Sequence, residues 1–203
     1  MSASELLFQL VTLWVSVDPV GTVPLFLAVT KDLNAVNRRR AAIRATVISF
    51  CVLTGFLYLG QYLLDVLRID LVSFQVAGGI VLFLFALSMI FADSSVNKAA
   101  AEAGHDVAVF PLAMPSIATP GAMLAVVVLT DNDRYTLGQQ TITLGLLAVV
   151  LAATLILMLL ANRVVDWIGQ SGANVLSRVM GIILASVAVQ MVFSALKPFL
   201  KSG

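Results

Sequence analysis

The chain has 203 residues, of which 60% are hydrophobic and 11% are charged, and its formal net charge at pH 7 is +1. This composition excludes a soluble globular domain and predicts a polytopic membrane protein. A net charge near zero leaves no basic surface for nucleic acid and no acidic surface for a basic partner. The single cysteine, Cys51, excludes an intrachain disulfide framework. Its apolar surroundings predict a small buried side chain rather than a reactive thiol.

Six apolar segments are long enough to cross the roughly 30 Å hydrocarbon core of a bilayer, which takes about 20 helical residues. Most of the links between them are short and polar. The longest link, Asp93–Asp106, is interpreted as a flexible joint between two halves. The expected spans are Leu6–Thr30, Ala45–Leu64, Leu71–Ala92, Val107–Thr130, Tyr135–Asn162 and Val179–Leu196.

The distribution of Lys and Arg predicts the orientation, because cytoplasmic loops are enriched in these residues. The link Lys31–Arg44 holds five of them, whereas Asp65–Asp70 holds only Arg68. Placing the first link inside puts eight basic residues inside and four outside. We therefore expect both the N-terminus and the C-terminus to lie outside. The Arg38–Arg40 cluster is expected to set the topology and to contact lipid headgroups.

Two of the apolar segments carry residues that interrupt a helix. The stretch Asp18–Pro24 lies in the first span and Pro111–Gly121 lies in the fourth, and together they hold five of the six prolines. Proline removes a backbone donor and clashes with the preceding turn, and hydrocarbon offers no water to satisfy the freed carbonyls. The sequence therefore predicts a broken first helix and a broken fourth helix.

The two halves of the chain match each other at a nearly constant offset. A shift of 102 residues lays Gly79–Leu82 on Gly181–Leu184, and a shift of 101 lays Asp18-Pro19 on Thr119-Pro120. Chance matching between apolar segments is the alternative for any one match, but the paired prolines disfavour it.

Each half contains three spans, so the second half would enter the membrane from the opposite side. The halves are 1–98 and 99–203, within a single membrane domain. The predicted fold is an all-α integral membrane protein, with six transmembrane helices in two inverted three-helix repeats.

The two breaks predict a binding site. A broken helix leaves unpaired amides at the start of one half-helix and unpaired carbonyls at the end of the other. Such ends suit the carboxylate and the ammonium of a zwitterion, and inverted repeats would bring both breaks to one place near the midplane. The candidate substrate-binding residues are Asp18, Pro19, Gly21, Thr22, Pro24, Pro115, Ser116, Thr119, Pro120 and Gly121.

Two charged residues each allow two interpretations. Asp18 lies deep in its span, where a carboxylate is costly unless it is paired, hydrated or used as a cap. It can bind a substrate ammonium or a coupling proton, and it can also be the N-cap of a half-helix that starts at Pro19. Arg178 opens the last span, where it either snorkels or forms a loop salt bridge, or acts as a gate or an ion-pair partner of Asp18.

Other classes of protein are disfavoured by what the sequence lacks. No phosphate-binding glycine loop occurs, so an ATP-driven pump would need a partner chain. One His and one Cys cannot build a haem, iron–sulfur or zinc site of usual ligation, so no cofactor and no metal are expected. Asp18 is the only deep carboxylate, which disfavours a two-carboxylate intramembrane enzyme. An ion or small-solute channel remains the alternative, because broken half-helices also build pores.

Three motifs together resemble the MarC family of bacterial inner-membrane proteins. They are Asp18–Phe26, Pro111–Pro115 followed by Thr119–Gly121, and Leu176–Gly181. The resemblance covers essentially the whole chain and implies a multi-pass protein of the inner (plasma) membrane, related to small neutral amino acid transporters. The family's second break usually has the sequence Gly-Pro-Gly, so Thr119 is a departure at the expected ligand site.

We therefore expect a secondary transporter rather than an enzyme. It would carry a small neutral amino acid or a similar zwitterion by alternating access, with a proton or a sodium ion as the candidate coupling ion. Membrane lipid surrounds such a protein. Gly78, Gly79 and Gly181 predict close helix packing, which also makes a homo-oligomer a candidate assembly.

Overall fold

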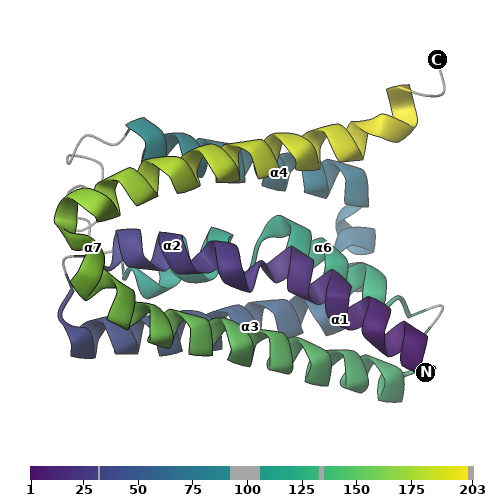
Figure 1. Cartoon of the computed structure of the whole chain (residues 1–203). Coiled ribbons are helices and arrows are strands. Elements are labelled where there is room, and N and C mark those ends of the chain that lie inside the picture. The colour runs from purple at the N-terminus through teal and green to yellow at the C-terminus, as the bar shows by residue number, and fades with distance from the viewer. Residues whose placement is uncertain (32, 92–105, 133–134, 201–203) are drawn as a thin grey trace.

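The computed structural model describes residues 1–31, 33–91, 106–132 and 135–200, without the side chains of 85, 88–89, 162–174, 176–177, 180 and 198–200. In these ranges all regular structure is helical, which confirms the predicted all-α class (Figure 1). The elements in chain order are α1 (Ala3–Val17), α2 (Pro19–Val29), α3 (Ala35–Leu67), α4 (Leu71–Phe91), η1 (Ala108–Ile117), α6 (Pro120–Leu129) and α7 (Leu137–Leu200).

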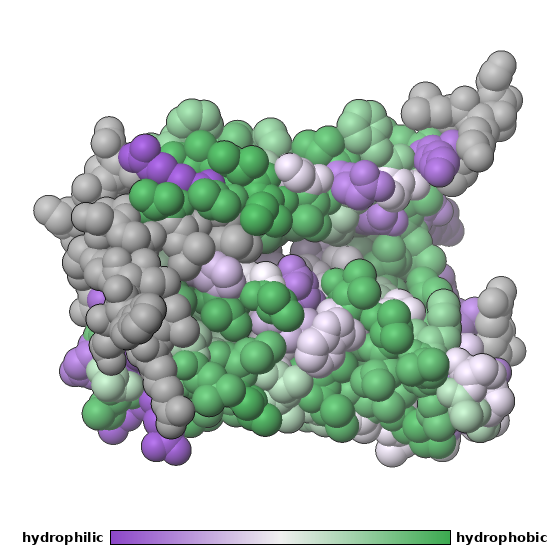
Figure 2. Space-filling view, viewed as in Figure 1, coloured by the Kyte–Doolittle hydropathy of each residue, from purple (hydrophilic) through white to green (hydrophobic). Residues whose placement is uncertain are grey.

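The helices have the length and composition of membrane spans. Three stretches, Ala3–Val29, Ala35–Leu67 and Leu137–Ala161, are long and apolar enough to cross a bilayer. The pair of η1 and α6 gives a fourth span, bent by 54° at its break. Leu71–Leu84 and Gly181–Lys197 are shorter apolar helices. Hydrophobic side chains cover much of the surface in Figure 2, as a lipid environment requires.

The last two predicted spans, Tyr135–Asn162 and Val179–Leu196, lie almost entirely in one continuous element, α7. Its ribbon reverses direction and returns alongside α4, so the two spans form two legs (Figure 1). The sequence between them holds no proline, so every residue there keeps its backbone donor. We call Leu137–Ala161 the first leg of α7 and Gly181–Lys197 its second leg.

α4 and the second leg of α7 pack against each other as one layer above the remaining helices (Figure 1). A Cβ on Gly79 would lie 3.1 Å from Ala188 O, and a Cβ on Gly181 would lie 3.0 Å from Ala86 O. The two helices are therefore antiparallel and approach closely through glycine, as predicted. The two contacts are equivalent under the offset of 102 residues, because Gly181 corresponds to Gly79 and Ala188 corresponds to Ala86.

The two broken spans also end in the same way. The hydroxyls of Thr30 and Thr130 each donate to the carbonyl four residues earlier, at 2.6 Å. The carbonyl of each threonine then accepts from the first turns of the next helix. Arg38 Nε donates to Thr30 O at 3.3 Å, and Gln140 Nε2 donates to Thr130 O at 3.0 Å.

Two expectations about single side chains are wrong. Arg38 does not reach lipid headgroups, because it is only 8% exposed and its Nε and Nη2 donate to the carbonyls of Thr30 and Leu33. Cys51 is exposed rather than buried. It lies on the side of α3 opposite Leu53, which is fully buried in the core.

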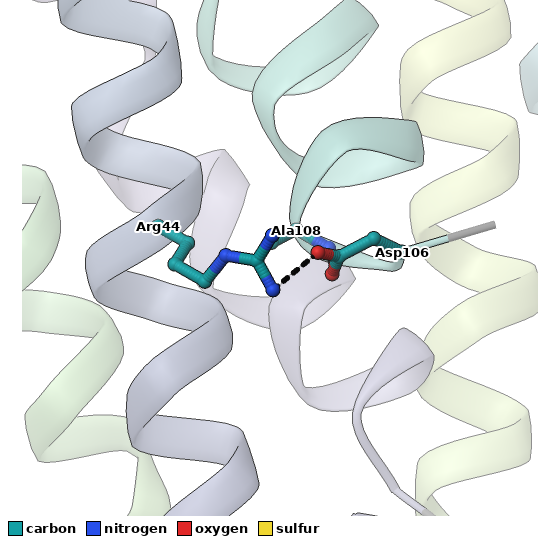
Figure 3. A network of polar contacts seen from close by, with 3 residues as sticks. All are labelled: Arg44, Asp106 and Ala108. Carbon is teal, nitrogen blue, oxygen red and sulfur yellow. Dashed lines mark hydrogen bonds and ion pairs between the residues drawn. The ribbon is translucent and has the colours of Figure 1, made fainter.

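A polar contact holds the start of η1 on α3 (Figure 3). The Asp106 carboxylate forms an ion pair with Arg44 and accepts from Ala108 N at 3.0 Å. Both charged side chains are partly exposed, so the ion pair contributes little to stability. Its role is to connect α3 with the first residue of η1 through Asp106.

The packing of Gly181 predicts a stability difference between two glycines of α7. Gly181→Ala should lower the thermal midpoint in detergent by roughly 2–4 °C, because the new methyl group meets Ala86 O and Ile90. Gly145 has no atom within 4 Å of its Cβ position. Gly145→Ala should therefore raise stability by up to about 1 kcal/mol through helix propensity. Equal effects of the two substitutions would contradict the packing.

Candidate functional site

Asp18 is both the C-cap of α1 and the N-cap of α2, so the first break is at this single residue. Its φ is 48°, in the left-handed region, so α1 ends and α2 begins at this residue. Asp18 Oδ1 accepts from Gly21 N at 2.9 Å, and its carbonyl accepts from Thr22 N at 3.0 Å. The prediction that Asp18 caps a half-helix starting at Pro19 is confirmed.

The carboxylate of Asp18 lies directly over Gly21. A Cβ on Gly21 would lie 2.0 Å from Asp18 Oδ2, so only glycine leaves room for the cap. Thr22 is 2% exposed and its hydroxyl donates to Asp18 O at 2.9 Å. The Thr22 hydroxyl thus gives its proton to the backbone of the break, whereas the Asp18 side chain is exposed.

Val20 is a functional candidate that sequence reasoning missed. Its N–H has no partner in the described part of the chain. Its carbonyl would normally accept from the residue four positions later, which is Pro24, and proline has no N–H to donate. The four-residue spacing of Val20 and Pro24 is the signal that could have identified it. One residue therefore offers both a donor and an acceptor.

Thr119 caps the second break in the same manner. Its Oγ1 accepts from Ala122 N at 2.8 Å and its carbonyl accepts from Met123 N at 2.9 Å, with Pro120 at the first helical position. The N–H of Gly121 has no partner among the described residues. Where related sequences are expected to have glycine, the Thr119 hydroxyl supplies the cap that Asp18 supplies in the first half.

The two breaks contact each other. Thr119 Oγ1 donates to Ser16 O at 3.0 Å. Ser16 lies in the last turn of α1, where carbonyls have no partner within the helix. One hydroxyl therefore caps α6 and also satisfies the end of α1.

The segment before the second break differs from the predicted half-helix. η1 is not a regular α-helix, because Phe110 and Met114 have extended backbones. Each of these residues precedes a cis proline. A proline ring clashes with the residue before it and disfavours helical backbone angles at that residue. Pro115 and Ser116, both predicted to bind substrate, are buried in this segment. Its counterpart α1 is regular over 15 residues.

The layer of α4 and the second leg of α7 covers the second break. A Cβ on Gly78 would lie 2.1 Å from Pro120 Cβ. Met191 Cε lies 3.6 Å from the Cβ position of Gly121, and Met191 O accepts from Gln75 Nε2 at 3.0 Å. No sequence motif marked Met191 or Gln75, because their contacts with the break depend on the packing of distant segments.

Asp18 is the only charged residue within the two breaks. Arg178 is exposed on α7 and has no ion pair with Asp18 in the described ranges. The same ranges hold no group of three or more His, Cys, Asp and Glu side chains that could bind a metal ion. The chemistry on offer includes the Asp18 carboxylate, the unpaired N–H groups of Val20 and Gly121, and carbonyls such as that of Val20 whose helical partner would be a proline. Such groups can in principle bind a small dipolar solute.

Residues 3–200 match the family described as "MarC family integral membrane protein". The chain is 31% identical over 198 residues to the inner membrane protein YhgN of Escherichia coli K12, covering 98% of this chain and 99% of the relative. It is 33% identical over 190 residues to a membrane protein of Archaeoglobus fulgidus, covering 91% and 89%. It is 30% identical over 204 residues to YvbG of Bacillus subtilis, covering 97% and 96%. No solved structure matches.

The free carbonyl of Val20 predicts opposite effects of one substitution on stability and on binding. Pro24→Ala restores an N–H to bond Val20 O, so the thermal midpoint should rise. Glycine binding, measured by calorimetry, should weaken by about tenfold, the value of a hydrogen bond to a charged group. Pro19→Ala is the comparison variant, because it restores an N–H at the same break without giving Val20 O a partner. Unchanged binding in Pro24→Ala would remove Val20 from the site.

Proposed function

We propose that this chain, which belongs to the MarC family of integral membrane proteins, is a secondary transporter of small neutral amino acids or similar zwitterions. Family membership places it in the membrane, and the relatives' names give no activity. The observation that carries the proposal is the hydrogen bond from Thr119 Oγ1 to Ser16 O, because it brings the two capped helix breaks into direct contact. Transporters bind their substrates at such discontinuous helices.

The chemistry of the breaks fits a zwitterion. The N–H groups of Val20 and Gly121 lie at the positive ends of α2 and α6 and suit a carboxylate. The Asp18 carboxylate and the Val20 carbonyl suit an ammonium group.

An inverted repeat of 1–98 and 99–203 is the architecture that we propose for transport. It is supported by the Gly79–Ala188 and Gly181–Ala86 contacts, which exchange under the sequence offset. Contacts that exchange in this way are expected at a two-fold axis. The matched caps of Thr30 and Thr130 add a second line of support.

Alternating access would expose the joined breaks to each side in turn, with both termini outside and the basic link Lys31–Arg44 inside. Asp18 is the candidate acceptor of a coupling proton, and a sodium ion is the other candidate. A cavity of about 740 Å³ lies at the opposite end of α3 from the basic link, where the ends of α3 and α6 meet the start of α4. It is lined by three carboxylates, Asp65, Asp70 and Asp131, and is the proposed outer mouth.

Reconstitution into proteoliposomes tests the function. Labelled glycine or alanine uptake should saturate and should require an ion gradient. Flux that does not saturate would indicate a channel, and hydrolysis of lipid or peptide without flux would indicate an enzyme.

Asp18→Asn tests the site within the same assay. Asparagine tolerates the left-handed backbone and is an equally good N-cap, so the folded yield should stay within about twofold. Transport should fall by about tenfold or more, because the charge that meets the ammonium is removed. A collapse of the yield would make Asp18 a structural cap, and unchanged transport would exclude it from substrate binding.

A further inference from the structure

A polar groove lies on the layer formed by α4 and the second leg of α7. It has a volume of about 430 Å³ and is lined by Gln75, Ser186, Val187, Gln190, Met191 and Ser194. Four of these six side chains are polar, although both helices are predominantly apolar. We call this set the polar groove.

The polar side chains of α7 follow one face of the helix. Ser186, Gln190 and Ser194 recur every four residues and are all exposed. Ser186 Oγ donates to the carbonyl oxygen of Ile182, one turn earlier in the helix, and Gln190 Nε2 donates to Ser194 Oγ at 3.2 Å. The Gln190 amide therefore keeps a second N–H and its oxygen for another partner. Exposed amides in hydrocarbon are costly, so we expect this face to meet water, a polar solute or another polar surface.

The side chain of Met191 lies between the polar groove and the second break. Met191 lines the groove, and its Cε lies 3.6 Å from the Cβ position of Gly121. Gln75, from the facing helix, holds this turn in place through its bond to Met191 O. The space-filling view shows the molecule hollowed between this layer and the helices below it (Figure 2).

We propose that the polar groove is the path by which a net-neutral, hydrogen-bonding solute reaches the break at Thr119–Gly121. The proposal rests on the transport function proposed above. Amides and hydroxyls both donate and accept, so they can solvate a carboxylate and an ammonium alike. The groove lining carries no charged side chain, and it therefore offers no counter-ion to a bare anion or cation.

Cysteine accessibility in proteoliposomes tests the path. In a full-length Cys51→Ala background, Gln190→Cys is treated with a charged, membrane-impermeant thiol reagent. Val189→Cys is the matched control, because Val189 is adjacent in sequence, exposed, and about 100° around the helix, away from the groove. Gln190→Cys should react about tenfold faster than the control, since only a hydrated thiol ionises. Saturating glycine should slow the reaction.

The outcomes separate the path from the transport function. Fast, glycine-protected labelling supports the path, whatever the flux assay gives. Equal labelling of the two variants would overturn it. A disulfide between two copies of Gln190→Cys, with slow labelling, would also overturn it, because a second copy of the chain would then occupy the groove. If glycine does not slow the labelling, the substrate does not pass through the groove, and the proposal is wrong.

Discussion

The Thr119 hydroxyl is the interaction on which the site depends. A helix break inside a membrane leaves backbone groups that no water satisfies, and each costs several kcal/mol in hydrocarbon. Thr119 meets this constraint twice, because it accepts from Ala122 N in α6 and donates to Ser16 O in α1. The two breaks are thereby held together, and the groups left over include the N–H of Val20 and of Gly121. The Val20 carbonyl is added to them, because its helical partner would be the N–H that Pro24 lacks. In the function that we propose, a solute with both a carboxylate and an ammonium would satisfy these groups.

The two halves solve the same backbone problem with different side chains. Asp18 caps α2 with a charge and Thr119 caps α6 without one. Beyond the breaks, Arg38 closes the end of α2 and the neutral Gln140 closes the end of α6. At these four positions the charged side chains lie in the first half of the chain and the neutral ones in the second. If the proposed zwitterion binds at the joined breaks, the single carboxylate of Asp18 would give it one preferred orientation.

Local rules predicted the parts of this structure that depend on neighbouring residues. The apolar segments became helices, and Asp18 before a proline became an N-cap, because both follow from a few adjacent residues. Val20 was missed because its side chain is unremarkable and only its backbone is left unpaired. Met191 was missed because its contact with Gly121 joins two helices that are far apart in the sequence. A pattern of neighbouring residues cannot predict such a contact. The irregular backbone of η1 is caused by Pro111 and Pro115. Each proline disfavours helical backbone angles at the residue before it, and this outweighs the apolar pattern that favours a helix.

The central claim is that both breaks contact one ligand. A double-mutant cycle on glycine affinity, measured by calorimetry with the purified full-length chain, tests it through Asp18→Asn, Thr119→Val and their combination. Groups that hold the same solute should be energetically coupled, and the expected coupling is about 0.5 kcal/mol or more. Effects that add within about 0.3 kcal/mol would show that Asp18 and Thr119 act independently, and would contradict a single site.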